Sequence, residues 1–479
     1  MWRTPGGSAV IRKSYDGARG GRYLARMRDL LSTLTGDVTG PDDPGWDAAR
    51  QAWNLVADQR PAAVVHAESA EDVAATVAYA RRAGLRVAVQ GTGHGAPAMG
   101  PLDGTVLLRT SRMTEVTVDP AAGTAWVQAG ATWHDVVGPA AEHGLAAPHG
   151  SSGTVGVAGY CLGGGLGWLA RSEGLAANAI LALDVVTADG EARRVDAQHE
   201  PELFWALRGG GGAHAIVTAL QLRLVPLREA FAGQLLWPMA QAAEVVQTYR
   251  AWTAALPETV TSTVKLVRYP PLPEVPEPLR GGAFAAITLV AVGDVTRGDD
   301  LVAPLRAVGP PLLDTLAVVP AAQLASIAGD PPGPLPGLGG DGILLGPLDA
   351  DGIAAYVALA GPDAPVPLIH LELRHLGGAL ARGDAGHGAL DRLEGEFLLY
   401  GVGVPVTAEV GAAVLATLDG ARERMALYAA SSPPRSLLTF DERSPGIRAS
   451  FPADVADRLV RVKAAYDPDG LLVGNHVVA

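Results

Sequence analysis

Short apolar runs alternate with amphipathic stretches through residues 69–226, and turn residues separate them. Ser69 precedes an apolar series at helical spacing (Val73, Val77) that stops at Gly84, which predicts a capped helix. The β-like runs are shorter and are parted by Asp-Pro and Ala-Gly turns. Strands are expected at residues 86–89, 106–108, 116–118, 125–128, 180–187 and 216–225, and helical pattern at 51–55, 69–83, 132–143 and 202–207.

After residue 230 the composition changes, and longer helical patterns alternate with longer apolar strands. Proline-rich joints at residues 270–278 and 331–336 separate the pieces. Helices are expected over residues 242–254, 350–360, 408–428 and 453–466, and strands over 260–267, 285–290 and 368–373. The chain of 479 residues is therefore predicted to have an α+β fold with more than one domain.

Composition and charge exclude several classes of protein. Lys and Arg number 37 against 50 Asp and Glu, a net charge of -13, which argues against a nucleic-acid binder. No apolar run reaches the ~18 residues of a membrane span. The basic start of the chain lacks the apolar segment of a signal peptide, so we expect a cytoplasmic protein whose first residues are a disordered extension or precede a true start at Met27.

Three glycine clusters stand out: Gly91-Thr-Gly-His-Gly95, Gly163-Gly-Gly-Leu-Gly167 and Gly209–Gly212. Glycine lets backbone N–H groups approach a phosphate or a flat ring closely. Neither the Walker pattern nor the dinucleotide-binding fingerprint is present. The clusters predict one extended nucleotide ligand, and a set of tight turns is the alternative.

The single side chains near these clusters give weaker evidence of function than the clusters themselves. His94 lacks a second His, Asp or Glu at metal-ligand spacing, so no metal site is expected. Ser151 and Ser152 lie outside a Gly-x-Ser-x-Gly elbow, which lowers the odds of a serine hydrolase. Cys161, the single cysteine, is expected to be a buried filler.

Longer motifs occur in a fixed order along residues 50–226 and 453–476. They are Arg60-Pro-Ala-Ala-Val64, Val87-Ala-Val-Gln-Gly-Thr-Gly-His94, Gly130-Ala-Thr-Trp133, His143-Gly-Leu-Ala146, Gly150-Ser-Ser-Gly-Thr-Val-Gly156, Gly159-Tyr-Cys-Leu-Gly-Gly-Gly-Leu-Gly167, Leu203-Phe-Trp-Ala-Leu-Arg-Gly-Gly-Gly-Gly212 and Tyr466-Asp-Pro-Asp-Gly470. Together they resemble the FAD-binding half of the berberine-bridge-enzyme-like oxidases, a group of the vanillyl-alcohol-oxidase superfamily.

This resemblance implies a two-part FAD-binding domain of the PCMH type and an α+β substrate domain with an antiparallel sheet. The implied division is an extension at 1–45, partly disordered, an FAD-binding domain at 46–228, a substrate domain at 229–434 and a C-terminal return at 435–479. His94 falls where the family bonds FAD covalently, and Ser152 stands where doubly linked members have Cys, so a single link is implied. The implied FAD-binding residues are Gly91, Thr92, Gly93, His94, Gly95, Ser152, Thr154, Gly156, Gly159, Gly163, Gly164, Gly165, Val217 and Asn475.

The sequence departs from the family at several polar positions. Gln90 stands where the family usually has an arginine. The Asn-Tyr-x-Asp pattern that many members carry before the last helix is absent, and the most similar segment is Leu437-Leu-Thr-Phe-Asp441. A base is therefore expected on the substrate domain, where a strand alternates His370, Glu372 and Arg374 on one face. Glu372 is predicted as the base and Arg374 as its partner, with Tyr400 as a second candidate and a solvated sheet face as the alternative.

These observations favour an FAD-dependent oxidase that passes hydride from a small alcohol, sugar, phenol or natural-product intermediate to the flavin, with dioxygen as acceptor and hydrogen peroxide as product. A non-redox flavin scaffold, an FAD-dependent dehydrogenase and an unrelated glycine-rich nucleotide binder are the alternatives. Neither nucleic acid nor a membrane is expected as a partner. The sequence leaves the substrate and the oligomeric state open.

Overall fold

The computed structural model describes residues 34–331, 333–364, 366–443 and 446–479. Its first sheet has the strand order β1-β2-β4-β3-β21, in which only β1 runs antiparallel to its neighbour. The strands are β1 (Asp37–Thr39), β2 (Ala63–His66), β3 (Arg86–Gln90), β4 (Thr105–Arg109) and β21 (Leu472–Val473). Helix α3 (Ala70–Ala83) packs on this sheet through Val73 and Val77. It begins where the Ser69 hydroxyl accepts the N–H of Asp72 and ends at Gly84, whose φ of 67° is left-handed.

A second, antiparallel sheet follows in the chain with the strand order β5-β6-β10-β8-β9. Its strands are β5 (Val116–Asp119), β6 (Thr124–Gln128), β8 (Ile180–Val186), β9 (Ala192–Val195) and β10 (Ile216–Arg223). The helices of this region are α5 (Trp133–Glu142), α6 (Val157–Leu162), α7 (Ala170–Glu173) and α8 (Pro201–Leu207). Trp133, Val157 and Leu203 are fully buried in the core that these elements share. The glycine-rich segment 150–167 contributes Val157, Cys161 and Leu166 to this core.

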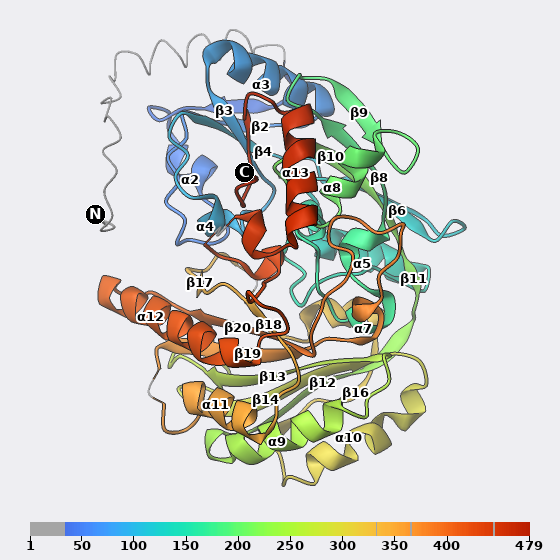
Figure 1. Cartoon of the computed structure of the whole chain (residues 1–479), viewed down its shortest axis with the longest axis vertical. Helices are drawn as coiled ribbons and strands as arrows, with labels where there is room; N and C mark the ends of the chain where they lie inside the picture. Colours follow the sequence, from blue (N-terminus) through green and yellow to red (C-terminus); the bar gives the residue numbers. More distant parts are fainter. Residues whose placement is uncertain (1–33, 332, 365, 444–445) are drawn as a thin grey trace.

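The third sheet has nine strands and runs β15-β12-β14-β13-β19-β20-β17, with β16 beside β12 and β18 beside β20. Its strands are β12 (Glu229–Pro238), β13 (Val260–Arg268), β14 (Ala283–Ala291), β15 (Leu313–Asp314), β16 (Ala317–Pro320), β17 (Leu338–Gly339), β18 (Ile343–Leu345), β19 (Leu368–His375) and β20 (Phe397–Gly403). Four helices pack on one face: α9 (Ala242–Thr253), α10 (Gly298–Arg306), α11 (Ala350–Ala360) and α12 (Ala408–Met425). The other face looks toward the first two sheets (Figure 1).

The end of the chain returns to the first half. Helix α13 (Ala453–Tyr466) packs against α8, and β21 adds to β3 as the outer strand of the first sheet (Figure 1). Lys463 holds this return in place: its Nζ donates to the carbonyls of Ala213 (2.7 Å) and Leu472 (3.0 Å) and pairs with the buried Asp467. Asp467 in turn accepts the N–H groups of Leu471 and Leu472.

The observed fold confirms the predicted class, an α+β chain with antiparallel sheets. The helical pattern at 51–55 is wrong: helix α2 is Trp46–Arg50, and the next residues form a bend, an isolated bridge and a turn. Tertiary contacts decide this, because Trp53 donates its N–H to Thr92 and Asn54 pairs with Leu335. Of the predicted extension, Asp37–Thr39 form β1, and residues 1–33, including Met27, lie outside the described residues.

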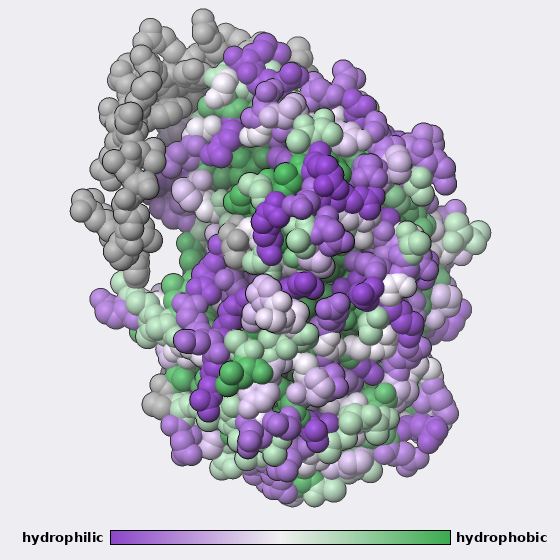
Figure 2. Space-filling model, viewed as in Figure 1, coloured by the Kyte–Doolittle hydropathy of each residue, from purple (hydrophilic) through white to green (hydrophobic). Residues whose placement is uncertain are grey.

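The surface mixes hydrophilic and hydrophobic residues, and hydrophilic ones dominate the face in Figure 2. Large apolar side chains that are well exposed are scattered, such as Val406 and Leu427 at the ends of α12. Within the described ranges, no helix combines the length and apolarity that crossing a bilayer requires.

We predict that Lys463→Met destabilises the protein by about 3–5 kcal/mol, because it leaves the Asp467 carboxylate buried without its cation. Guanidinium-induced unfolding followed by tryptophan fluorescence measures the effect as a lower midpoint. Arg461→Met is the matched control, since Arg461 is exposed on the same helix and its loss should change the stability by less than about 0.5 kcal/mol. Equal midpoints for the two variants would contradict the role of Lys463.

Candidate active site

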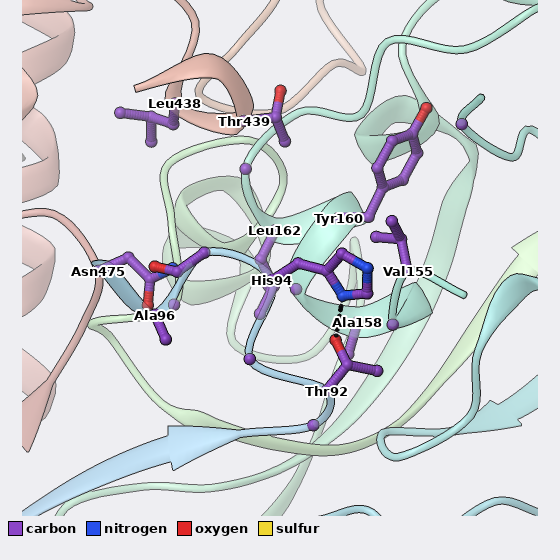
Figure 3. A pocket seen from close by; sticks show the side chains of 18 of the residues that line it. Thr92, His94, Ala96, Val155, Ala158, Tyr160, Leu162, Leu438, Thr439 and Asn475 are labelled. Carbon is purple, nitrogen blue, oxygen red and sulfur yellow. Dashed lines mark hydrogen bonds between the residues drawn. The ribbon is translucent and has the colours of Figure 1, made fainter. Parts of the chain in front are cut away.

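A cavity of about 430 Å³ lies between the nine-stranded sheet and the glycine-rich loops of the first half. One wall is formed by the loop after β3 and by residues 150–163, and the opposite wall by side chains of β13, β19 and β20. The segments 438–442 and 473–476 complete the lining. In Figure 3, Thr92 and His94 lie on one side of the cavity and Leu438 and Thr439 on another.

The loop Gly91–Gly95 presents its N–H groups as a row of free donors. Its carbonyl groups point into the protein: Gly91 accepts Arg109, Thr92 accepts the N–H of Trp53, and Gly93 accepts the N–H groups of Asn54 and Ala96. Within the described part of the chain, the N–H groups of Gly91–Gly95 donate to no acceptor. The φ of 88° at Gly93 turns the chain, and a side chain there would meet Ala52 at 2.9 Å. Such a row of donors forms a cradle for an anion.

His94 is held on three sides. Its ring stacks on Trp53 with 3.9 Å between ring centroids, and its Nδ1 is hydrogen-bonded to the Thr92 hydroxyl at 2.8 Å (Figure 3). Its Nε2 is 3.3 Å from the hydroxyl of Thr154, which also bonds Ser152. Burial lowers the pKa of the His94 imidazole to about 4. The ring is therefore neutral near pH 7, the form in which a ring nitrogen can act as a nucleophile.

Most of the other predicted cofactor residues meet at this cavity. Those that line it with the loop are Ser152, Gly156, Gly159, Gly163, Val217 and Asn475. Thr154 reaches His94 without lining the cavity. Gly164 and Gly165 do not line it either: both have positive φ, and they pack against Leu390 and Tyr160. Their requirement for glycine therefore comes from the turn and from protein packing.

The residues present fit a flavin dinucleotide. The donor cradle suits a pyrophosphate, and Gly156 and Gly159 keep one wall free of side chains, as a flat ring requires. The tyrosine hydroxyl of Tyr160, the hydroxyl of Thr439 and the Nε of Arg374 are buried without a partner in the described structure, and Tyr160, Thr439 and Arg374 all line the cavity. Unpartnered buried polar atoms indicate a ligand with polar groups of its own.

The nine-stranded sheet contributes a polar row to the opposite wall. Lys265 of β13 pairs with Glu372 of β19, and Glu372 pairs with Tyr400 of β20 in the strand register. His370 and Arg374 lie two residues away on the same face, as the alternation in the sequence predicts. Leu371 and Leu373 point to the helices on the other face. The carboxylate of Glu372 is only 1% exposed, so this face is not solvated.

Glu372 binds two cations. Its Oε1 accepts Arg374 Nη2 at 3.0 Å, and its Oε2 lies 3.4 Å from Lys265 Nζ. Burial opposes its ionisation, but Arg374, Lys265 and His370 outweigh burial and hold the pKa of Glu372 at about 2. A carboxylate so stabilised is a weak proton acceptor, because an efficient general base has a pKa near the working pH.

Tyr400 and Glu442 form an acid–phenol pair in the lining of the same cavity. The Tyr400 hydroxyl donates to Glu442 Oε1 at 2.8 Å, and Glu442 Oε2 is buried without a partner in the described structure. Burial raises the pKa of Glu442 to about 7, and the neighbouring Asp341 and Asp441 add to this while the bond from Tyr400 opposes it. Gly339 leaves room for the pair, since a Cβ there would meet the Tyr400 hydroxyl at 2.6 Å.

Cys161, which the sequence singled out, lies apart from this chemistry. Cys161 is fully buried in the core, where burial raises the pKa of its thiol, so its position is that of a packing residue. Across the described ranges, no cluster of three or more His, Cys, Asp or Glu is arranged to hold a metal ion.

Sequence reasoning missed Trp53, Lys265 and Glu442. Lys265 carried a signal, because it is a charged residue in the interior of a strand whose other residues, apart from the terminal Arg268, are apolar or hydroxylic. Glu442 follows the segment Leu437–Asp441 directly, but only the fold brings it to Tyr400, 42 positions earlier in the chain. Trp53 had no signal, since its contact with His94 depends on an irregular segment that the sequence predicts as helical.

Comparisons with known proteins agree with this site. A family model described as an FAD binding domain matches residues 61–196. (R)-6-hydroxynicotine oxidase of Paenarthrobacter nicotinovorans is 37% identical over 215 residues, which are 44% of this chain and 47% of that protein. The alignment thus spans about half the length of that relative.

Solved structures extend the similarity to the whole fold. Physcomitrella patens BBE-like 1 superposes with a TM-score of 0.82 over 95% of this chain and 99% of that one, at 19% identity. Acremonium strictum glucooligosaccharide oxidase, which carries a 6-S-cysteinyl, 8α-N1-histidyl FAD, has a TM-score of 0.79 over 95% and 98% of the two chains, at 21% identity. The chain therefore contains an FAD-binding domain, and its whole fold is similar to that of FAD-linked oxidases, a BBE-like protein among them.

Proposed function

We propose that this protein is an FAD-dependent oxidase of a small organic substrate, with FAD bonded covalently through His94 alone. The observation that carries the proposal is the cavity itself, where the donor row of Gly91–Gly95 and the neutral His94 face the Tyr400–Glu442 pair. Similarity to hydroxynicotine and glucooligosaccharide oxidases supports an oxidase in place of a dehydrogenase. The substrate carries an oxidisable C–H bond beside an O–H or N–H group.

The chain's own residues handle the proton and orient the substrate. Tyr400 accepts the proton of the substrate O–H or N–H group while its own proton passes to Glu442, the carboxylate 2.8 Å away. Arg374, whose Nε has no partner in the described structure, stabilises the negative charge that develops on the substrate oxygen. The chemistry that FAD supplies when bound is acceptance of a hydride from the substrate carbon and reoxidation by dioxygen, with hydrogen peroxide as the product.

Glu372, the base predicted from the sequence, suits another task in this proposal. Its two cation contacts hold it ionised and poorly basic, and they fix Lys265 and Arg374 toward the cavity. We assign it as a positioning residue, and the variants below decide between the two roles.

A screen of diverse alcohols, phenols and amines under air, read as hydrogen peroxide release, tests the oxidase activity. A yellow protein whose flavin is reduced by a substrate without peroxide release would instead be a dehydrogenase. A yellow protein whose flavin no compound reduces would favour a non-redox flavin scaffold.

We predict that the native protein precipitated in trichloroacetic acid gives a yellow pellet, with the mass of FAD on the peptide that contains His94. His94→Ala removes the only nucleophile of the proposed link, so its pellet should be colourless. His143→Ala, at an exposed histidine, is the control and should keep its colour. A colourless native pellet would contradict the covalent link.

We predict that Glu442→Gln slows anaerobic flavin reduction by about 10²–10⁴-fold, the usual contribution of one general base. In the native protein, the rate should rise with pH through an apparent pKa near 7, because the raised pKa of Glu442 leaves the accepting carboxylate protonated below that pH. The variant should lose this pH dependence. Stopped-flow absorbance of the flavin measures both effects, and a native pH profile in Glu442→Gln would place the base elsewhere.

We predict that Glu372→Gln acts mainly on substrate affinity. Loss of its charge frees Lys265 and Arg374, so the substrate concentration at half-maximal reduction should rise while the limiting rate stays within about tenfold of native. The same stopped-flow series separates the two quantities. A fall of the limiting rate by about 10²-fold or more with unchanged affinity would restore Glu372 as the base.

A further inference from the structure

We infer that Arg109 is the cation that binds the pyrophosphate of FAD electrostatically, from beneath the loop Gly91–Gly95. The inference rests on the proposed binding of FAD and goes beyond it, because Arg109 does not line the cavity and belongs to none of the motifs that predict FAD binding. Arg109 lies beside Gln90, the position at which the sequence departs from the family by lacking an arginine.

The position of Arg109 in the sheet is the first argument. It is the last residue of β4, and it pairs in register with Gln90, the last residue of β3, from which the loop Gly91–Gly95 continues. Both strands are parallel and end at the same edge of the sheet. Ligands of open α/β sheets bind outside the carboxyl ends of the strands, which is where Arg109 stands.

The contacts of Arg109 are the second argument. Its guanidinium donates to the carbonyl of Gln51 at 3.0 Å, to Gln90 Oε1 at 3.4 Å and to the carbonyl of Gly91 at 3.4 Å. Gln90 Oε1 lies 3.1 Å from the place of a Cβ on Gly93, so this pair supports the loop from below. By holding the Gly91 carbonyl inward, Arg109 helps to turn the free N–H groups of the loop outward.

The charge of Arg109 is the third argument. The side chain is 9% exposed, its Nε has no hydrogen-bond partner, and no carboxylate of the described chain pairs with it. Its cross-strand neighbours are Gln90 and His66, neither of them an acid. A guanidinium stays charged in a protein, and a buried charge without a counter-ion is costly. An anion on the far side of the loop would compensate it.

Arg171 shows what a buried arginine of purely structural role looks like in the same molecule. It also lacks an acidic partner, but its guanidinium donates through Nε to Val260 at 2.7 Å and through Nη1 to His375 at 3.0 Å and to Leu376. Further carbonyls, of Leu256 and Pro257, accept from Nη2. Arg109 has fewer and longer contacts, and it adjoins the donor cradle.

The test measures binding of FAD and of riboflavin, which lacks phosphate, by quenching of flavin fluorescence. The background is His94→Ala, in which FAD binds without a covalent link and can be removed by gel filtration. Adding Arg109→Met should raise the Kd of FAD by about tenfold or more, and should flatten its dependence on salt, while the Kd of riboflavin changes by less than about twofold. Arg109→Lys keeps the charge and should restore FAD binding to within about threefold of the background.

Arg112→Met is the matched control, because Arg112 lies three residues further on, is partly exposed and pairs with Asp37 and Glu68. Its FAD affinity should equal that of the background. Equal weakening of FAD and riboflavin in Arg109→Met, or equal weakness of the Met and Lys variants, would show a packing role and overturn the inference. Failure of the background protein itself to bind FAD would overturn the proposed function, a different outcome. If Arg109→Met does not fold, the Lys variant decides alone by its ratio of FAD to riboflavin affinity.

Discussion

The pairing of Glu372 with Arg374 and Lys265 determines how charge is distributed in the cavity. One buried carboxylate holds two cations on the face of the nine-stranded sheet, so these cations are unavailable to the acids nearby. Glu442 and Asp441 form no ion pair in the described structure, and burial raises the pKa of both carboxyl groups, to about 7 and about 6. The neighbours of Glu372 therefore lower its pKa, whereas burial raises the pKa of Glu442, so two carboxyl groups that line one cavity differ in protonation.

The same balance explains how a sheet can serve as an active-site wall. The alternation of β19 sends Leu371 and Leu373 into the helical layer and Glu372 toward the cavity, so one strand stabilises the core and lines the candidate site. Charged residues at such buried positions are costly unless they are paired. The cross-strand register of β13, β19 and β20 provides the pairing, because it aligns Lys265, Glu372 and Tyr400 in one row.

The cofactor side of the cavity relies on backbone in place of charged side chains. The loop Gly91–Gly95 lines the cavity, its carbonyls accept hydrogen bonds from the protein, and its N–H groups have no acceptor in the described structure. Neighbouring segments stabilise this arrangement. The N–H groups of Trp53 and Asn54 donate to the carbonyls of Thr92 and Gly93, and Asn475 donates to the Gly95 carbonyl from the end of the chain. The site is therefore assembled from segments more than 300 residues apart.

The sequence by itself determined the elements whose signals are local. The helix after Ser69, the helices 350–360 and 453–466 and the glycine loops follow from caps, periodicity and conformational freedom, and the order of the motifs predicted an FAD-binding domain, which a family model matches over residues 61–196. Only the tertiary structure decided the irregular, non-helical course of residues 51–55, the pair Tyr400–Glu442 and the burial of Arg109. The physical reason is that a pKa, a stacked ring or an uncompensated charge depends on neighbours in space, and no local pattern encodes which distant residues those neighbours are.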